Sequence, residues 1–188
     1  MIHAEVMGLD LRFETAPGLF SPTRPDAGTL AMLGQVSFAP EDKVLDLGCG
    51  YGLVGVAVAR RIGPERVWLL DKDPEAVACA ARNLVLNGAA GAICVQSDGF
   101  RDFTETGFTK ILCNPPYHED FGVPKHLIEK GFNRLVIGGS MWMVTRREAW
   151  YRNKLTSLFG GVRVHRDGGY VVFEAVKKSG SYANKGGR

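Results

Sequence analysis

The pattern from which the architecture follows is Val44-Leu45-Asp46-Leu47-Gly48-Cys49-Gly50-Tyr51-Gly52. Its first four residues predict a short apolar strand, and a helix is expected immediately after the turn, over Leu53–Ile62. The glycines let the backbone turn sharply, and they let a ligand approach the main chain where a Cβ would block it. A strand, a glycine-rich turn and a helix in this order are typical of the first unit of a doubly wound α/β fold.

Strands and helices alternate downstream of this unit. Strands are expected at Val67–Leu70, Ala92–Gln96, Lys110–Cys113 and Ser140–Thr145, and helices at Glu75–Leu86, Pro124–Leu135 and Glu148–Leu158. This alternation predicts a mostly parallel sheet with helices on both faces. A C-terminal hairpin, Val162–Val164 with Tyr170–Val176, would place an antiparallel strand at or near one edge of that sheet.

The segment upstream of the glycine-rich turn predicts an extension of the fold. Ile2–Glu5 and Leu9–Phe13 suggest a short β-hairpin, and a loop rich in Pro and Gly then leads to a helix that Asp26 caps and that runs through Gln35. We expect residues 1–176 to form a single domain, in which residues 1–40 cover the site. The remainder, 177–188, is rich in Gly, Ser and Lys and is expected to be a flexible tail.

Composition narrows the class of protein. The 188 residues are 45% hydrophobic and 23% charged, which is ordinary for a globular protein in water. No apolar run approaches the roughly 20 residues that a membrane span requires, and acidic residues near the N-terminus argue against a signal peptide. The cysteines lack CxxC or metal-ligand spacing, so we expect reduced thiols, no metal site and a cytoplasmic location; they are Cys49, Cys79, Cys94 and Cys113.

Charge is distributed unevenly along the chain. Residues 1–94 hold 8 Lys and Arg against 11 Asp and Glu, whereas residues 121–188 hold 13 against 4. The basic part is a candidate for contact with a polyanion such as a nucleic acid. The alternative is a well-solvated surface without a charged partner.

Acidic residues stand at three successive strand ends. Asp46 ends the first strand, Asp71 the second and Asp98 the third, and the carboxyl ends of parallel strands meet where such folds bind ligands. Asp46 suits a cationic amino group, Asp71 can accept both ribose hydroxyls, and Asp98 can accept from an exocyclic amine such as that of adenine. Together they favour a nucleoside that carries a cationic amino acid.

A dinucleotide cofactor is the alternative at this turn. Residues 50–55 match the G-x-G-x-x-G fingerprint, and an acid follows about 20 residues on. However, Asp46 lies just before the turn and would repel a diphosphate. We therefore disfavour a nicotinamide or flavin cofactor.

The fourth strand end carries Asn114-Pro115-Pro116-Tyr117. The amide oxygen of Asn114 and the carbonyl of Pro115 can each accept one N–H of an amine whose lone pair is delocalised, and so direct that lone pair at a methyl donor. The prolines stiffen the turn, and Tyr117 offers a face on which a planar base can stack. The alternative is a purely structural Asn-Pro turn.

These motifs resemble the class I S-adenosylmethionine-dependent methyltransferases of the amino-methylating branch. The segments Pro17–Ser21 and Asp26–Thr29, and the run Asn114–His118, are similar to the rRNA guanine-N2 methyltransferases of the small-subunit (MTS) type. The resemblance covers roughly residues 10–176. It implies S-adenosylmethionine as cofactor, S-adenosylhomocysteine as product, ribosomal RNA as partner, and a set of cofactor-binding residues: Asp46, Gly48, Cys49, Gly50, Gly52, Asp71, Lys72, Asp98, Gly99 and Asn114.

The resemblance also implies roles for residues near the substrate. Asn114, Pro115, Pro116 and Tyr117 would be the catalytic residues that receive the guanine amine. Contacts with the substrate, or a lid over it, would come from Phe20, Ser21, Thr29, His118, Arg146 and Arg147.

The target of methylation is less specified than the family. Tyr117 stands where the rRNA enzymes carry Phe, and this Tyr is typical of related enzymes acting on protein glutamine or adenine. A protein glutamine, adenine or small-amine substrate therefore stays open. So does a non-catalytic RNA-assembly factor, although the intact run Asn114–Tyr117 argues against it.

Overall fold

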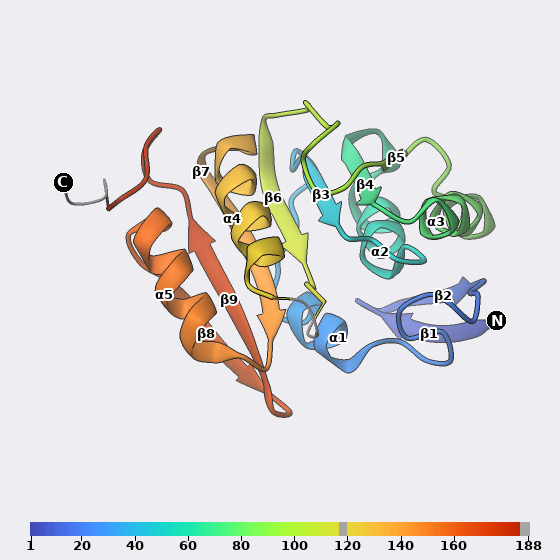
Figure 1. Ribbon diagram of the computed structural model, residues 1–188. Coiled ribbons are helices and arrows are strands. Elements are labelled where there is room, and N and C mark those ends of the chain that lie inside the picture. Colours follow the sequence, from blue (N-terminus) through green and yellow to red (C-terminus); the bar gives the residue numbers. More distant parts are fainter. Residues whose placement is uncertain (117–119, 185–188) are drawn as a thin grey trace.

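The computed structural model describes residues 1–116 and 120–184 (Figure 1). Its helices are α1 (Ala27–Leu33), α2 (Leu53–Ile62), α3 (Pro74–Leu86), α4 (Gly122–Arg134) and α5 (Glu148–Phe159), with a 3-10 turn at Pro64–Arg66. Its strands are β1 (Ile2–Val6), β2 (Leu9–Phe13), β3 (Val44–Leu47), β4 (Val67–Asp71), β5 (Ile93–Gln96), β6 (Phe108–Cys113), β7 (Leu135–Thr145), β8 (Arg163–Asp167) and β9 (Tyr170–Val176).

Seven strands form one sheet in the order β5-β4-β3-β6-β7-β9-β8. The first five in this order run parallel, and β9 pairs antiparallel with both β7 and β8. The expected doubly wound α/β fold and its closing hairpin are confirmed. The order reverses between β3 and β6, and ligands bind beyond the carboxyl ends of strands at such a point.

Alternate residues of each strand face opposite sides of the sheet. In β3, Val44 packs among residues of α1, α2 and α3, whereas the next residue, Leu45, packs among residues of α4 and α5. Leu69 and Leu70 of β4 divide in the same way. Figure 1 shows α4 and α5 together on one face of the sheet. Two apolar layers therefore enclose the sheet and hold its strand ends at a common edge.

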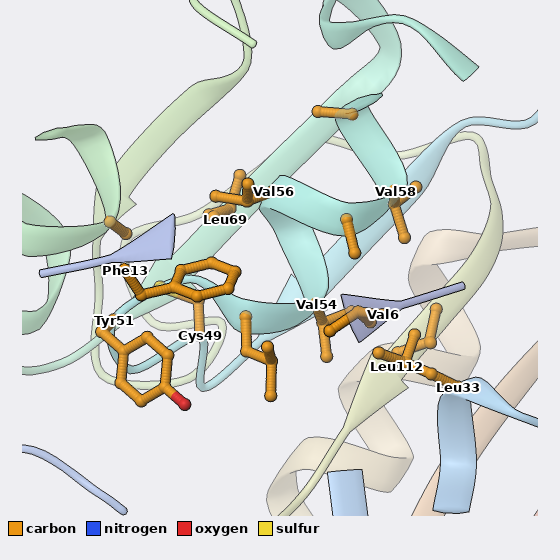
Figure 2. Close-up of a cluster of buried hydrophobic side chains, with 14 of the residues drawn as sticks. Val6, Phe13, Leu33, Cys49, Tyr51, Val54, Val56, Val58, Leu69 and Leu112 are labelled. Carbon is orange, nitrogen blue, oxygen red and sulfur yellow. The ribbon is translucent and has the colours of Figure 1, made fainter. Parts of the chain in front are cut away.

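The hairpin β1–β2 packs against α2 and α3, on the layer that contains the glycine-rich turn. Figure 2 shows the ring of Phe13 beside that of Tyr51, and the ring centroids are 5.5 Å apart. Asn83 of α3 donates from Nδ2 to the carbonyls of Tyr51 and Glu14 at 2.8 and 2.9 Å. The N-terminal extension is thereby fastened to the turn.

Strand β7 begins five residues earlier than the sequence predicts. Leu135 already has extended backbone, directly after the last residue of α4, and Gly138 and Gly139 exchange backbone hydrogen bonds with Lys177. The sequence pattern did not predict the first half of this strand, because the two glycines lower its strand propensity. At Gly139 a side chain would be crowded, since a Cβ would lie 3.0 Å from the carbonyl oxygens of Phe108 in β6 and Val136 in β7.

The expected flexible tail is docked as far as Asn184. Lys177 is buried, and its ammonium donates to the carbonyls of Phe132 and Leu135, both at 2.8 Å, at the end of α4. The ring of Tyr182 packs edge-on against Phe132. The polar composition hid these contacts, because a single lysine and a single tyrosine anchor the segment. Residues 185–188 lie outside the described part.

The structure also bears on the expectations for the cysteines and for membrane spans. All four cysteines are free thiols. Among the helices of the described residues, none is long and apolar enough for a membrane span.

Candidate active site

A cavity of about 460 Å³ lies where β3, β4, β5 and β6 end. Ten of the residues singled out in the sequence line it: Phe20, Gly48, Gly50, Asp71, Lys72, Asp98, Gly99, Asn114, Pro115 and Pro116. The doubly wound topology explains this grouping, because it brings the ends of parallel strands to one edge of the sheet. The N-terminal segment supplies one wall, through Gly18 and Leu19 as well as Phe20.

The first two glycines of the turn leave the floor of this cavity open. Gly48 and Gly50 have φ values of 75° and 54°, and no atom lies within 4 Å of the position that a Cβ would occupy on either. The backbone conformation requires glycine. Because these positions face empty space, a ligand can approach the main chain there.

Gly52, which the resemblance places among the cofactor-binding residues, packs against α3. It does not line the cavity, and a Cβ on it would lie 3.1 Å from the Cβ of Ala80 in α3. Gly55, one turn into α2, would meet Leu69 at 2.3 Å. The glycine-rich run thus divides into two ligand-facing positions and two that let α2 pack closely on its neighbours.

Asp46 lies beneath the turn, with only 4% of its surface exposed. Its Oδ2 accepts a hydrogen bond from Gly55 N–H at 2.8 Å, near the start of α2. Burial, with a smaller contribution from the charge of Asp71, raises the pKa of Asp46 to about 7. A cationic group placed beside it would favour the ionised form.

Asp46 and Cys49 border a small recess of about 40 Å³ that shares Gly48, Gly50 and Asn114 with the main cavity. Burial raises the pKa of the Cys49 thiol, so it stays protonated and serves as apolar lining. The hydroxyl of Tyr51 is buried in the described residues without a hydrogen-bond partner. Sequence analysis had not assigned this hydroxyl, and a polar ligand group in the recess would satisfy it.

Asp71 braces the glycine-rich turn from β4. Its Oδ2 accepts from Gly50 N–H at 2.8 Å, and its Oδ1 accepts from Asp73 N–H at 3.0 Å. Each carboxylate oxygen has a second lone pair, so both can still accept from a ligand. Asp98, at the end of β5, is exposed and pairs with Arg101 at 3.2 Å.

His126 of α4 also lines the cavity, although it is not among the site residues that the sequence predicts. Its Nε2 accepts from Phe100 N–H at 3.3 Å, and burial, aided by the charges of Arg101 and Lys130, lowers its pKa. The imidazole is therefore neutral at pH 7. The signal that could have revealed it is helical spacing, since Val123 and His126 lie one turn apart on α4 and share the face that borders the cavity.

Asn114 is held by residues of the N-terminal segment. Its Nδ2 donates to Asp26 Oδ2 at 2.8 Å and to Thr29 Oγ1 at 2.9 Å. The same Asp26 oxygen caps α1 by accepting from Thr29 N–H at 2.7 Å. Because two acceptors hold the amide nitrogen, the amide oxygen is carried on the opposite branch of the planar head group. The sequence predicted Asp26 only as a helix cap.

Of the other predicted positions, some border the cavity and some do not. Phe20 borders both the cavity and the recess and is 53% exposed. Ser21 borders neither; it has a φ of 50°, and its hydroxyl donates to the carbonyl of Arg24, so it shapes the loop. Tyr117 and His118 lie outside the described residues.

Arg146 and Arg147 follow β7, and neither lines the cavity. Both side chains are exposed. The guanidinium of Arg146 lies over the ring of Tyr170 and that of Arg147 over the ring of Phe121, each 4.5 Å from the ring centroid.

Comparison with known proteins identifies methyltransferases that act on ribosomal RNA as relatives of the chain. The chain is 32% identical over 172 residues to "Ribosomal RNA small subunit methyltransferase C" of Pseudomonas putida and 31% identical over 171 residues to that of Pseudomonas aeruginosa. It covers 51% of either protein, and these alignments include 89% and 88% of the chain. The chain thus spans about half the length of the curated relatives it matches.

Two solved structures resemble the fold. A T. thermophilus 16S rRNA N2 G1207 methyltransferase, in complex with AdoMet and guanosine, superposes with a TM-score of 0.85 at 29% identity, over 94% of this chain and 50% of that one. A methyltransferase from Pyrococcus furiosus gives a TM-score of 0.71 at 19% identity, over 92% and 91%. Residues 10–174 match the methyltransferase small domain family. The chain belongs to the methyltransferase small domain family.

Proposed function

We propose that the chain binds S-adenosylmethionine in the cavity and methylates the exocyclic amine of a guanine in ribosomal RNA of the small subunit, in the cytoplasm. The observation that carries this proposal is the orientation of Asn114, whose amide nitrogen is held by Asp26 and Thr29. The relatives support the choice of substrate, since their names specify small-subunit ribosomal RNA and the solved relative contains AdoMet and guanosine.

The residues at the strand ends fit this cofactor. Gly48 and Gly50 leave open space along the main chain, Asp71 would accept from ribose hydroxyls, and Asp98 from the adenine amine. Asp46 offers an acceptor to an amino acid group, and the hydroxyl of Tyr51, which has no partner among the described residues, offers a donor. When bound, S-adenosylmethionine supplies a methyl group on a positively charged sulfur and leaves as S-adenosylhomocysteine.

The chain's own contribution to transfer is positioning. The Asn114 amide oxygen and the Pro115 carbonyl would accept the two N–H groups of the guanine amine, which is a weak nucleophile because its lone pair is delocalised. Acceptors that are already oriented cost no reorganisation when positive charge develops on the amine. The amine proton can leave to water after transfer, so neither a metal nor a covalent enzyme intermediate is needed.

Nucleoside mass spectrometry of ribosomal RNA tests this proposal. RNA from cells with and without the gene would be digested and compared, and we expect loss of one N2-methylguanosine when the gene is absent. Purified protein with methyl-labelled cofactor should restore that modification on RNA from the deleted strain. An unchanged profile, together with label on protein or on a small amine, would overturn the assignment to RNA.

A further inference from the structure

Two consecutive arginines stand at the carboxyl edge of the sheet beside Asn114. Strand β7 lies next to β6 in the sheet, and Cys113, which precedes Asn114, pairs with Met143. Thr145 ends β7, and its hydroxyl accepts from Arg147 N–H at 2.9 Å. The chain thus leaves the sheet at Arg146 and Arg147, close above the level of Asn114.

Each arginine is directed to a different flank of the cavity. Arg146 lies over the ring of Tyr170. That ring packs closely on Gly28 of α1: a Cβ added to Gly28 would lie only 2.7 Å from Cε1 of Tyr170. That helix is the one that holds Asn114. Arg147 lies over Phe121, which directly precedes α4, between the cavity-lining residues Asp120 and Gly122. The two guanidiniums therefore point to different elements, one toward the ring that packs on α1 and the other toward the start of α4.

Stacking on an aromatic ring orients a guanidinium for binding to a phosphate. A guanidinium stacked on a ring keeps its N–H donors at its edge, where they fit two oxygens of a phosphate, and it loses less side-chain entropy on binding than a freely moving one. The seat of Arg147 is itself rigid, because Phe121 stacks on Trp150 with 4.5 Å between the ring centroids.

Arg147 differs from three other arginines of this basic half, which pair with acids. Arg152 and Arg166 both pair with Glu148, and Arg163 pairs with Glu174. In contrast, Arg147 has no ion pair with any residue that the structure describes. Phosphate contacts from exposed arginines supply affinity and register in RNA complexes.

We propose that Arg146 and Arg147 form a two-point clamp for the RNA backbone, with one guanidinium on a phosphodiester at each side of the nucleotide that enters the cavity. The inference rests on the proposed function, because it takes RNA as the substrate. It assigns backbone recognition to the rim of the site, and base recognition to the cavity.

The test is a salt titration of RNA binding by the full chain. Fluorescence anisotropy with a short, labelled, guanosine-rich single-stranded RNA would compare wild type with Arg146→Gln, Arg147→Gln and the double variant. Each lost phosphate contact should reduce the slope of log affinity against log salt by about 0.7, and the double variant by about 1.4. Arg163→Gln, which removes the same charge from the edge strand β8, should leave the slope within about 0.2 of wild type.

A second variant separates the ring from the charge. Phe121→Leu retains Arg147 but removes its seat, and the clamp predicts weaker RNA binding with the wild-type salt slope. Calorimetry with S-adenosylmethionine would establish that each variant is folded. Wild-type slopes in both arginine variants would overturn the clamp while RNA methylation by the wild type still stands. Failure of the wild type to bind or methylate any RNA would instead overturn the proposed function.

Discussion

The ends of β3 and β6 border the same cavity, but they are built from different parts of the chain. At β3, Asp46 bonds to Gly55, nine residues on, and Gly50 bonds to Asp71, 21 residues on. At β6, the partners of Asn114 lie 85 and 88 residues earlier, in and before α1. The hydrogen bonds that hold the proposed cofactor-binding turn are therefore local, whereas those that orient Asn114 depend on the docking of a distant segment.

This difference separates two kinds of functional effect. Changes at the end of β3 should alter cofactor affinity, because its carboxylates and glycines shape the floor of the cavity. Changes around Asn114 should alter the rate of transfer, because they misdirect an acceptor without reshaping that floor. Four substitutions test the separation.

The largest effect is expected from Asn114→Ala. Loss of the oriented amide should lower kcat for RNA methylation about 100- to 1000-fold, the range found when one preorganised polar group is removed from an active site. Affinity for S-adenosylmethionine should stay within about threefold, a change below 1 kcal/mol. If turnover matched wild type, Asn114 would have no role in the transfer step. If rate and cofactor affinity fell equally, the proposed difference between the ends of β3 and β6 would be wrong.

Asp26→Ser should come next, because Asp26 acts through Asn114. Serine caps a helix as well as aspartate does, so the free energy of unfolding should change by less than about 0.5 kcal/mol. Serine is too short to hold the Asn114 amide as well, and kcat should fall about tenfold or more while KM for the cofactor is retained. Stopped assays at saturating cofactor measure this split. If Asp26 served only as a helix cap, both the stability and kcat of Asp26→Ser would match wild type.

Asp71→Ala probes the locally built half. Removal of a charged acceptor costs about 1.5–3 kcal/mol, so calorimetry should give S-adenosylmethionine binding about 10- to 100-fold weaker. Glu75→Ala is the matched control, because it removes an exposed carboxylate four residues away that does not line the cavity. If the two variants bound equally well, Asp71 would have no place in the cofactor site.

The last substitution tests the protonation of Asp46. Folding raises the pKa of this carboxyl from 3.8 to about 7, so the folded state holds the proton more tightly than the unfolded chain. The contribution to stability is therefore greatest below pH 4, declines as the pH rises to 7, and is constant above. Asp46→Asn should make the dependence of unfolding free energy on pH less negative between pH 4 and 7, by at most about 1.4 kcal/mol per pH unit. Parallel profiles in denaturant titrations would contradict the raised pKa.

Local patterns explain why the fold could be predicted. The range of α2, the cap of α3 by Asp73 and the positions of β3 and β4 all follow from residues close together in sequence. Strand β7 was predicted only in part, because Gly138 and Gly139 disguise its first half. The docking of residues 177–184 depends on tertiary contacts of Lys177 and Tyr182, which no periodicity reveals.

The same distinction applies to the site. Acids and glycines at strand ends could be placed from topology alone, and Asp71 and Gly50 line the cavity as that reasoning anticipated. The contact of Asp26 with Asn114 could not be derived, because it depends on how a separate helix docks against the sheet. The packing of Gly52 against α3 could not be predicted either, because the glycine motif does not distinguish glycines that face a cavity from those that face a helix.

Because α1 holds Asn114, turnover would depend on how much of the time α1 stays docked on the sheet. Asp26 and Thr29 orient the amide only while α1 is docked on the sheet, and Gly28 permits that docking by leaving room for the ring of Tyr170. Whenever α1 lifts away, the cavity floor at β3 persists but the acceptor loses its aim. Observed turnover is then the intrinsic rate multiplied by the fraction of molecules with α1 closed. The docking of this short helix would thereby set the fraction of time in which Asn114 is oriented for transfer.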